Sequence, residues 1–157
     1  MTGSEDRAAV PIPPPLIFFA LLAAGGSLEY FFPSKPVVCP VTVAMIAGAV
    51  LSIISGLLAV TSFAVLIRNK TTFNPAKPTT VIVRDGPFRL SRNPMYLALL
   101  LLLAGIAAYL CSLWLFLAVI ALYVTLDLFV IRREEEYLTR KFGQDYLAYK
   151  SSVRRWL

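Results

Sequence analysis

The stretch MYLALLLLLAGIAAYLCSLWLFLAVIALYVTLDLFVI, residues 95–131, decides the fold, because Asp127 is its only charged residue. A helix needs about 20 apolar residues to cross the hydrocarbon core of a bilayer. At about 1.5 Å per residue, one helix over the whole stretch would be much longer than that core is thick. We therefore predict a hairpin of two membrane helices, about 95–110 and 112–131, that turns near residues 109–112. One long tilted helix is the alternative, since the turn contains neither Gly nor Pro.

Two further apolar stretches precede the hairpin, at about residues 16–32 and 41–67. With the hairpin they predict an all-α membrane bundle of four transmembrane helices, built as a single domain over residues 16–157. Residues 1–15 are expected to form a flexible tail, because they carry charges and the proline cluster PIPPP. The second stretch also has small residues that allow close helix packing, either within the bundle or between chains: Gly48, Ser52, Ser55 and Gly56.

The composition of the chain also points to a membrane. Of its 157 residues 58% are hydrophobic and 15% charged, and the mean hydropathy is +0.73. A soluble domain usually has about 25% charged residues. The net charge of +6 is therefore interpreted as membrane topology and contact with lipid headgroups, not as nucleic-acid binding. Without His, and with Cys39 and Cys111 far apart in apolar contexts, neither a metal site nor a disulfide is expected.

Basic residues predict the orientation of the bundle. Lys and Arg gather in two segments, residues 68–92 and 132–155. Cytoplasmic loops of membrane proteins are enriched in such residues. A hairpin between the two segments places both on the cytoplasmic side, and four crossings then make both termini cytoplasmic.

The tail that follows the hairpin, residues 132–157, is polar but carries a helical stripe of apolar residues. Gly143 is expected to end or bend one helix and to begin another. The tail is therefore predicted to be helical and either to lie in the membrane interface or to cap the bundle from the cytoplasm. The stripe consists of Leu138, Phe142, Tyr146, Tyr149, Val153 and Trp156.

Two polar segments are the candidates for chemistry. GPFRLSRNPMY, residues 86–96, enters the third helix, and RREEE, residues 132–136, leaves the fourth. The hairpin brings both to the same membrane face, about a helix diameter apart. Without His there is no Ser-His-Asp or Cys-His unit, and no glycine-rich phosphate loop is present.

The order and spacing of these residues resemble a known family. GPFRLSRNPMYLAL followed by REEEYLTRKFGQDYLAY is similar to the isoprenylcysteine carboxyl methyltransferase family, and phospholipid methyltransferases share a related signature. The resemblance extends from Thr79 to the end of the chain. The matching residues are Gly86, Pro87, Phe88, Arg92, Pro94, Tyr96, Glu134, Glu135, Phe142, Gly143, Tyr146 and Tyr149.

The resemblance implies an integral membrane methyltransferase that uses S-adenosylmethionine at its cytosolic face, with an amphiphilic acceptor that approaches from the bilayer. The residues that it implies for cofactor binding are Thr80, Val81, Ile82, Val83, Phe88, Asn93, Pro94, Met95, Tyr96 and Glu134. Those that it implies for catalysis are Arg92, Asn93 and Glu135, and Arg133 and Asp127 are the candidates for acceptor binding.

The chemistry of the cofactor agrees with these residues. A carboxylate such as Glu134 matches its ammonium, while Arg92 or nearby helix N-terminal amides match its carboxylate. Aromatic faces tolerate both adenine and a sulfonium. Methyl transfer is an in-line displacement that positioning and desolvation can promote.

Three positions depart from the family pattern. Asn93 stands where the family usually has His, and Ala98 stands where it usually has Gly. Val130 stands where the prenylcysteine branch has Arg. The acceptor is therefore left open between a prenylcysteine-like carboxylate, a lipid amine and a thiol. The alternative function is a catalytically degenerate membrane protein that binds lipid or a partner through its basic cytoplasmic face.

Overall fold

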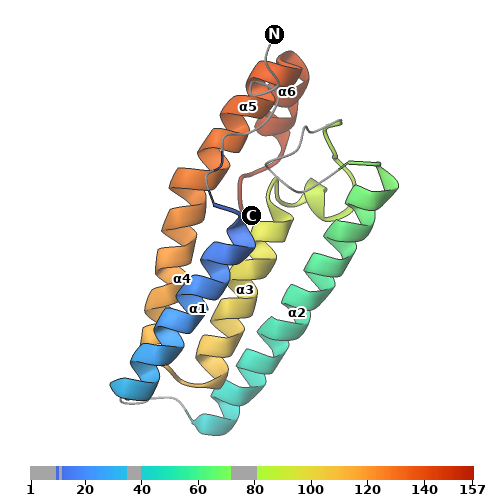
Figure 1. Ribbon diagram of the computed structural model, residues 1–157. Coiled ribbons are helices and arrows are strands. Elements are labelled where there is room, and N and C mark those ends of the chain that lie inside the picture. Colours follow the sequence, from blue (N-terminus) through green and yellow to red (C-terminus); the bar gives the residue numbers. More distant parts are fainter. Residues whose placement is uncertain (1–9, 11, 35–39, 72–80) are drawn as a thin grey trace.

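A computed structural model describes residues 10, 12–34, 40–71 and 81–157 of the chain, and these residues contain helices and no strand. Four long apolar segments form the bundle, and shorter helices stand at one end of it (Figure 1). The elements are α1 (Pro14–Phe31), α2 (Val41–Arg68), η1 (Gly86–Arg89), α3 (Pro94–Tyr109), α4 (Leu113–Thr125), η2 (Leu126–Ile131), α5 (Arg132–Phe142) and α6 (Gln144–Ser152).

In the bundle α3 packs on α4 on one side and on α2 on the other, and α1 lies along α4 and also contacts α3 (Figure 1). The predicted hairpin turns at Leu110 and Cys111, so the long apolar block is two helices and not one. Ser112 caps α4, since its hydroxyl accepts a hydrogen bond from the Leu115 N–H (3.3 Å). Pro94 begins α3, the position at which proline is best tolerated in a helix.

Three helices in the described part of the chain are long and apolar enough to cross a membrane: α1, α2 and the continuous helix Leu113–Phe142. Helix α3 is equally apolar but has only 16 residues. The side chains that α2 turns away from α3 are largely aliphatic and exposed, as expected of a surface that faces lipid.

Helices α2 and α3 approach closely through small residues. A Cβ added to Gly48 would lie 2.6 Å from the Gly105 carbonyl oxygen, and one added to Gly105 would lie 2.6 Å from the Ser52 hydroxyl. The Ser55 hydroxyl donates to the Ala98 carbonyl (2.7 Å). Three of the four predicted small residues therefore pack within the bundle. Gly56 does not pack within the described bundle, because a Cβ there would meet nothing within 4 Å.

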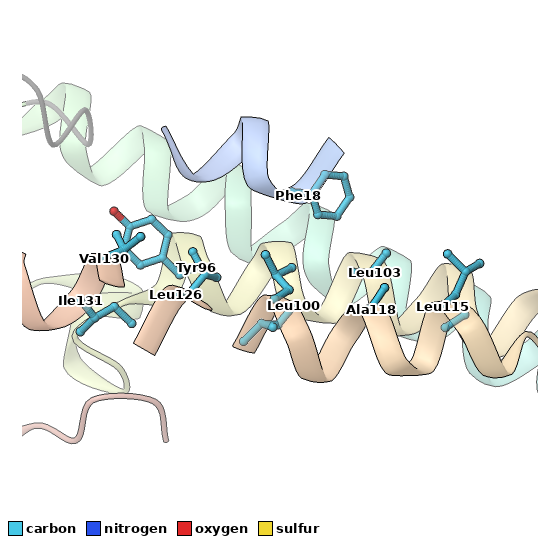
Figure 2. Close-up of a cluster of buried hydrophobic side chains, with 11 residues drawn as sticks. Phe18, Tyr96, Leu100, Leu103, Leu115, Ala118, Leu126, Val130 and Ile131 are labelled. Atoms are coloured by element: carbon cyan, nitrogen blue, oxygen red, sulfur yellow. The ribbon is translucent and has the colours of Figure 1, made fainter. Parts of the chain in front are cut away.

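The apolar core lies between α1, α3 and the continuous helix (Figure 2). Leu103, Leu122, Leu126 and Ile131 are fully buried in it. Tyr96 reaches the core from the first turn of α3 and faces the η2 segment (Figure 2). The end of the core nearest to η1 therefore borders the polar residues that begin α3.

The structure corrects two predicted boundaries. The fourth helix was expected to end at residue 131, but a π-helical segment, η2, carries it into α5 without a break, so the helix ends at Phe142. Charged residues 132–136 do not stop it, because Arg and Glu are good helix formers. The predicted break at Gly143 is confirmed, with a φ of +53°. The helical stripe was extended too far, since α6 ends at Ser152.

Charge is distributed unequally between the two ends of the bundle. Every Lys and Arg that the structure describes belongs to residues 68–92 or 132–155, at the end where α5 and α6 stand (Figure 1). At the other end Glu29 accepts hydrogen bonds from the hydroxyls of Ser34 (2.7 Å) and Ser112. These contacts join the end of α1 to the hairpin turn.

Candidate functional site

The two polar segments meet, as the hairpin predicted. The Tyr96 hydroxyl, on α3, donates a hydrogen bond to Oε1 of Glu134, on α5 (2.6 Å). One turn earlier, the Arg92 guanidinium contacts Oε1 of Glu135 (2.7 Å). The two adjacent carboxylates of α5 are thus bound by side chains from the entry to α3, Glu134 by the Tyr96 phenol and Glu135 by the Arg92 guanidinium.

Glu134 and Tyr96 form the apolar side of this site. Tyr96 is 6% exposed and its ring lies against Leu126 and Val130 (Figure 2). Val130, which stands where the prenylcysteine branch has Arg, is 1% exposed and belongs to the core. Among the described residues Tyr96 is the only hydrogen-bond partner of the Glu134 side chain. Glu134 is therefore a partly buried carboxyl group with no cationic partner in the described part of the chain.

Glu135 differs from Glu134, because three cationic side chains surround its carboxylate. Its carboxylate contacts Arg92, Arg155 (2.8 and 3.0 Å) and Lys150 (3.2 Å). The Arg92 and Glu135 side chains are each only 8% exposed. Arg92 also donates to the carbonyls of Lys150 (2.8 Å) and Val153 (3.0 Å). Its Nε–H, however, is buried without a hydrogen-bond partner in the described part of the chain.

Asn93 points toward the C-terminal segment of the chain. Its side-chain amide donates to the Arg155 carbonyl (2.9 Å), and its backbone N–H donates to the Ser91 hydroxyl (3.1 Å). Asn93 is thus held beside Arg92, and Pro94, Met95 and Tyr96 follow as the first residues of α3.

Asp127 and Arg133, the candidates for acceptor binding, have different surroundings. Asp127, in η2, accepts from the Arg155 guanidinium (3.1 Å to each oxygen) and from the Trp156 indole (3.0 Å). Arg133 is exposed on α5. Asp127 therefore belongs to the buried polar cluster, and its side chain binds protein groups.

The segment before α3 contacts α6. The Tyr149 hydroxyl donates to the Phe88 carbonyl (2.7 Å), and Arg84 donates to the Asp145 carbonyl (2.6 Å) while lying over the Tyr149 ring. Burial raises the pKa of Tyr149 to about 12. Of the four residues 80–83 predicted to line the cofactor, Val83 is buried, Ile82 half-buried and Val81 exposed, and Thr80 lies outside the described residues.

Sequence reasoning missed the contribution of the chain end. Lys150, Arg155 and Trp156 all enter the polar cluster, although none was assigned to the site. The hydrogen bonds that the Arg155 guanidinium donates to the Glu135 carboxylate raise the pKa of that guanidinium, which stays charged. The available signal was Asp127, because an acid within an apolar helix requires a partner.

Comparison with known proteins agrees with this architecture. The sequence model of the family described as phospholipid methyltransferase matches residues 43–145, which include both polar segments and the hairpin between them. An uncharacterized protein of Haemophilus influenzae is 46% identical over 63 residues, which are 40% of this chain and the whole of that protein. The match over most of its length shows that the chain belongs to the phospholipid methyltransferase family.

Proposed function

We propose that this membrane protein transfers a methyl group from S-adenosylmethionine to an amphiphilic acceptor, at the end of the bundle where α3 begins. The observation that carries the proposal is the pairing of Tyr96 with Glu134, a carboxyl group that has no cationic partner among the described residues, near the buried Arg92. The family relationship supports methyl transfer as the reaction.

The residues present fit the methionine end of that cofactor, which has an ammonium and a carboxylate. Glu134 has acceptor capacity left after its bond from Tyr96, and an ammonium supplies the missing positive partner. Arg92 has a buried Nε–H donor that needs an acceptor, and a carboxylate supplies it. These two groups would hold the cofactor, whose sulfonium supplies an electrophilic methyl group.

The other residues act by fixing these two groups. The Tyr96 hydroxyl orients Glu134, while Glu135 orients Arg92 and neutralises its charge. Asn93, predicted to be catalytic, would keep the chain end beside Arg92. Because the burial of Tyr96 and Arg92 excludes water, the site would favour transfer through position and desolvation to an acceptor that has already lost its proton.

The charges of the cluster favour a neutral nucleophile, such as a lipid amine, as the acceptor. Arg92, Lys150 and Arg155 already contact the carboxylates of Glu135 and Asp127. An anionic acceptor would have to compete with these carboxylates for its cation. A thiol or a prenylcysteine-like carboxylate is the less favoured acceptor class.

The placement in the membrane is part of the proposal. We take α3 as the fourth crossing, although it is short, because its residues are apolar and it packs on the continuous helix Leu113–Phe142, which begins with α4. The basic end then faces the cytoplasm, with both termini on that side, as the distribution of Lys and Arg favours. An acceptor would reach the site from the bilayer with its apolar part still in lipid.

Transfer of label from methyl-labelled S-adenosylmethionine tests the function. Purified protein in detergent is incubated with total membrane lipid, a prenylcysteine analogue or a small thiol, and each extract is counted. We expect label in amine-containing lipid, its loss in Glu134→Gln, and its retention in the exposed neighbour variant Glu136→Gln. Cofactor binding without transfer to any acceptor would instead favour the degenerate lipid-binding or partner-binding protein.

A further inference from the structure

The last residues of the chain return from α6 to the bundle and join its two polar segments. Residues 154–156, here called the C-terminal strap, cross the entry to α3. The Arg92 backbone N–H donates to the Arg154 carbonyl (3.0 Å), and the Asn93 side chain donates to the Arg155 carbonyl (2.9 Å). On its other side the strap meets η2 and α5 through the Arg155 side chain.

The Arg155 guanidinium is used on all three of its nitrogens. Its Nε and one terminal nitrogen donate to the two oxygens of Glu135, at 3.0 and 2.8 Å. The other terminal nitrogen donates to both oxygens of Asp127, at 3.1 Å. This planar, two-sided arrangement is one that arginine can make and lysine cannot.

The π-helical segment η2 makes this bridge possible. In a regular α-helix two residues eight positions apart, such as Asp127 and Glu135, point about 80° apart around the axis. Hydrogen bonds in a π-helix reach one residue further, so each residue turns less about the axis. The π segment Leu126–Ile131 thus turns Asp127 toward the face of Glu135, where one guanidinium contacts both.

We infer that Arg155 is a positioning residue of the methyltransferase site, which acts on the cofactor through Glu135 and Arg92. Arg155 fixes the Glu135 carboxylate, Glu135 fixes a terminal nitrogen of Arg92, and the buried Arg92 Nε–H then faces the ligand. The inference rests on the proposed function. The strap lies outside residues 43–145, the part of the chain that the family match covers.

The strap also contains a tryptophan, Trp156, whose fluorescence can report on its surroundings. The Trp156 indole donates to Asp127 (3.0 Å) and its ring lies 5.3 Å from that of Tyr123. Trp114, the other tryptophan of the chain, is at the opposite end of the bundle, where it donates to the Phe32 carbonyl. In a Trp114→Phe protein, the emission of Trp156 therefore reports on the strap.

Calorimetric titration with S-adenosylhomocysteine tests the inference on the full-length protein. We expect Arg155→Gln to weaken binding at least about tenfold, since it removes a charged partner from the buried Glu135 carboxylate and from Asp127. Arg155→Lys should recover part of this loss, because it restores the charge without the two-sided geometry. Arg154→Gln is the matched control, because that side chain is exposed, and its affinity should stay within about twofold of the wild type.

Fluorescence separates positioning from a purely structural role. In the Trp114→Phe protein, S-adenosylhomocysteine should change the emission of Trp156, and Arg155→Gln should abolish that change. Wild-type binding together with unchanged affinity in Arg155→Gln would overturn the inference and leave the proposed function intact. If Arg155→Gln does not fold, unchanged affinity in folded Arg155→Lys overturns it equally. A wild-type protein that does not bind at all overturns both.

Discussion

Replacing Glu135 by Gln is expected to destabilise the protein strongly. The substitution keeps the size of the side chain and removes the charge that three cations share. Arg92 would suffer most, because its side chain is 8% exposed and cannot turn to water. Arg155 and Lys150 are more exposed, at 28% and 42%, so solvent would compensate them in part.

The size of the effect follows from the burial of Arg92. Removing one partner of a buried ion pair costs about 3–5 kcal/mol, because the other charge stays buried and uncompensated. The contacts to the exposed partners, Lys150 and Arg155, add less, since exposed pairs contribute about 0–1 kcal/mol each. We expect about 3–5 kcal/mol in total, which is roughly 6–20 °C in the unfolding midpoint of a chain of this size.

Thermal unfolding in detergent, followed by tryptophan fluorescence, measures this loss. Glu136→Gln is the matched control, because Glu136 is exposed one position along the same helix, and its midpoint should stay close to that of the wild type. The double variant Glu135→Gln with Arg92→Gln should lose less than the sum of the two single variants, since it leaves no buried charge at position 92. A midpoint of Glu135→Gln equal to that of Glu136→Gln would refute the reasoning.

Three further predictions follow from the packing and the ionisation of particular residues. Tyr96→Phe should weaken binding of S-adenosylhomocysteine about tenfold in calorimetry, because it removes the hydroxyl that orients Glu134. Tyr109→Phe is the control and should have no effect, because Tyr109 is exposed at the other end of α3. Gly48→Ala should lower the unfolding midpoint, because the new Cβ would lie 2.6 Å from a carbonyl oxygen of α3. Gly56→Ala should raise the midpoint slightly, because its Cβ would meet nothing within 4 Å and Ala is the better helix former. The reverse order of midpoints would contradict the packing of α2 on α3. Burial raises the pKa of Tyr149 to about 12, so the contribution of its neutral hydroxyl to stability is complete below pH 10 and is lost as the pH rises toward 12. Unfolding experiments on Tyr149→Phe should therefore show a smaller loss of stability between pH 10 and 12 than the wild type. Equal losses would exclude Tyr149 as the cause.

The hairpin and the meeting of the two polar segments could be predicted because each depends on length and polarity along the chain. An apolar block too long for one crossing must turn, and its two polar ends then come together. The pairs Tyr96–Glu134 and Arg92–Glu135 follow from this arrangement.

The strap and the π-helical segment could not be predicted in the same way. The strap is held partly by backbone carbonyls, those of Arg154 and Arg155, and such contacts leave no pattern in the sequence. The apolar residues of η2 are compatible with either an α-helix or a π-helix, and the tertiary bridge from Arg155 distinguishes the two. The wrong helix end at residue 131 arose because the change from apolar to charged residues was interpreted as the end of a helix. It marks only the end of the apolar stretch.

If the entry to α3 and the carboxylates of α5 form a cofactor site, the wild-type protein must bind S-adenosylhomocysteine. Titration of the purified protein in detergent by calorimetry should give a saturable heat with one site per chain, and Glu134→Gln should lose most of that affinity while Glu136→Gln keeps it. No heat and no thermal shift at millimolar ligand, or equal binding by both variants, would contradict the account.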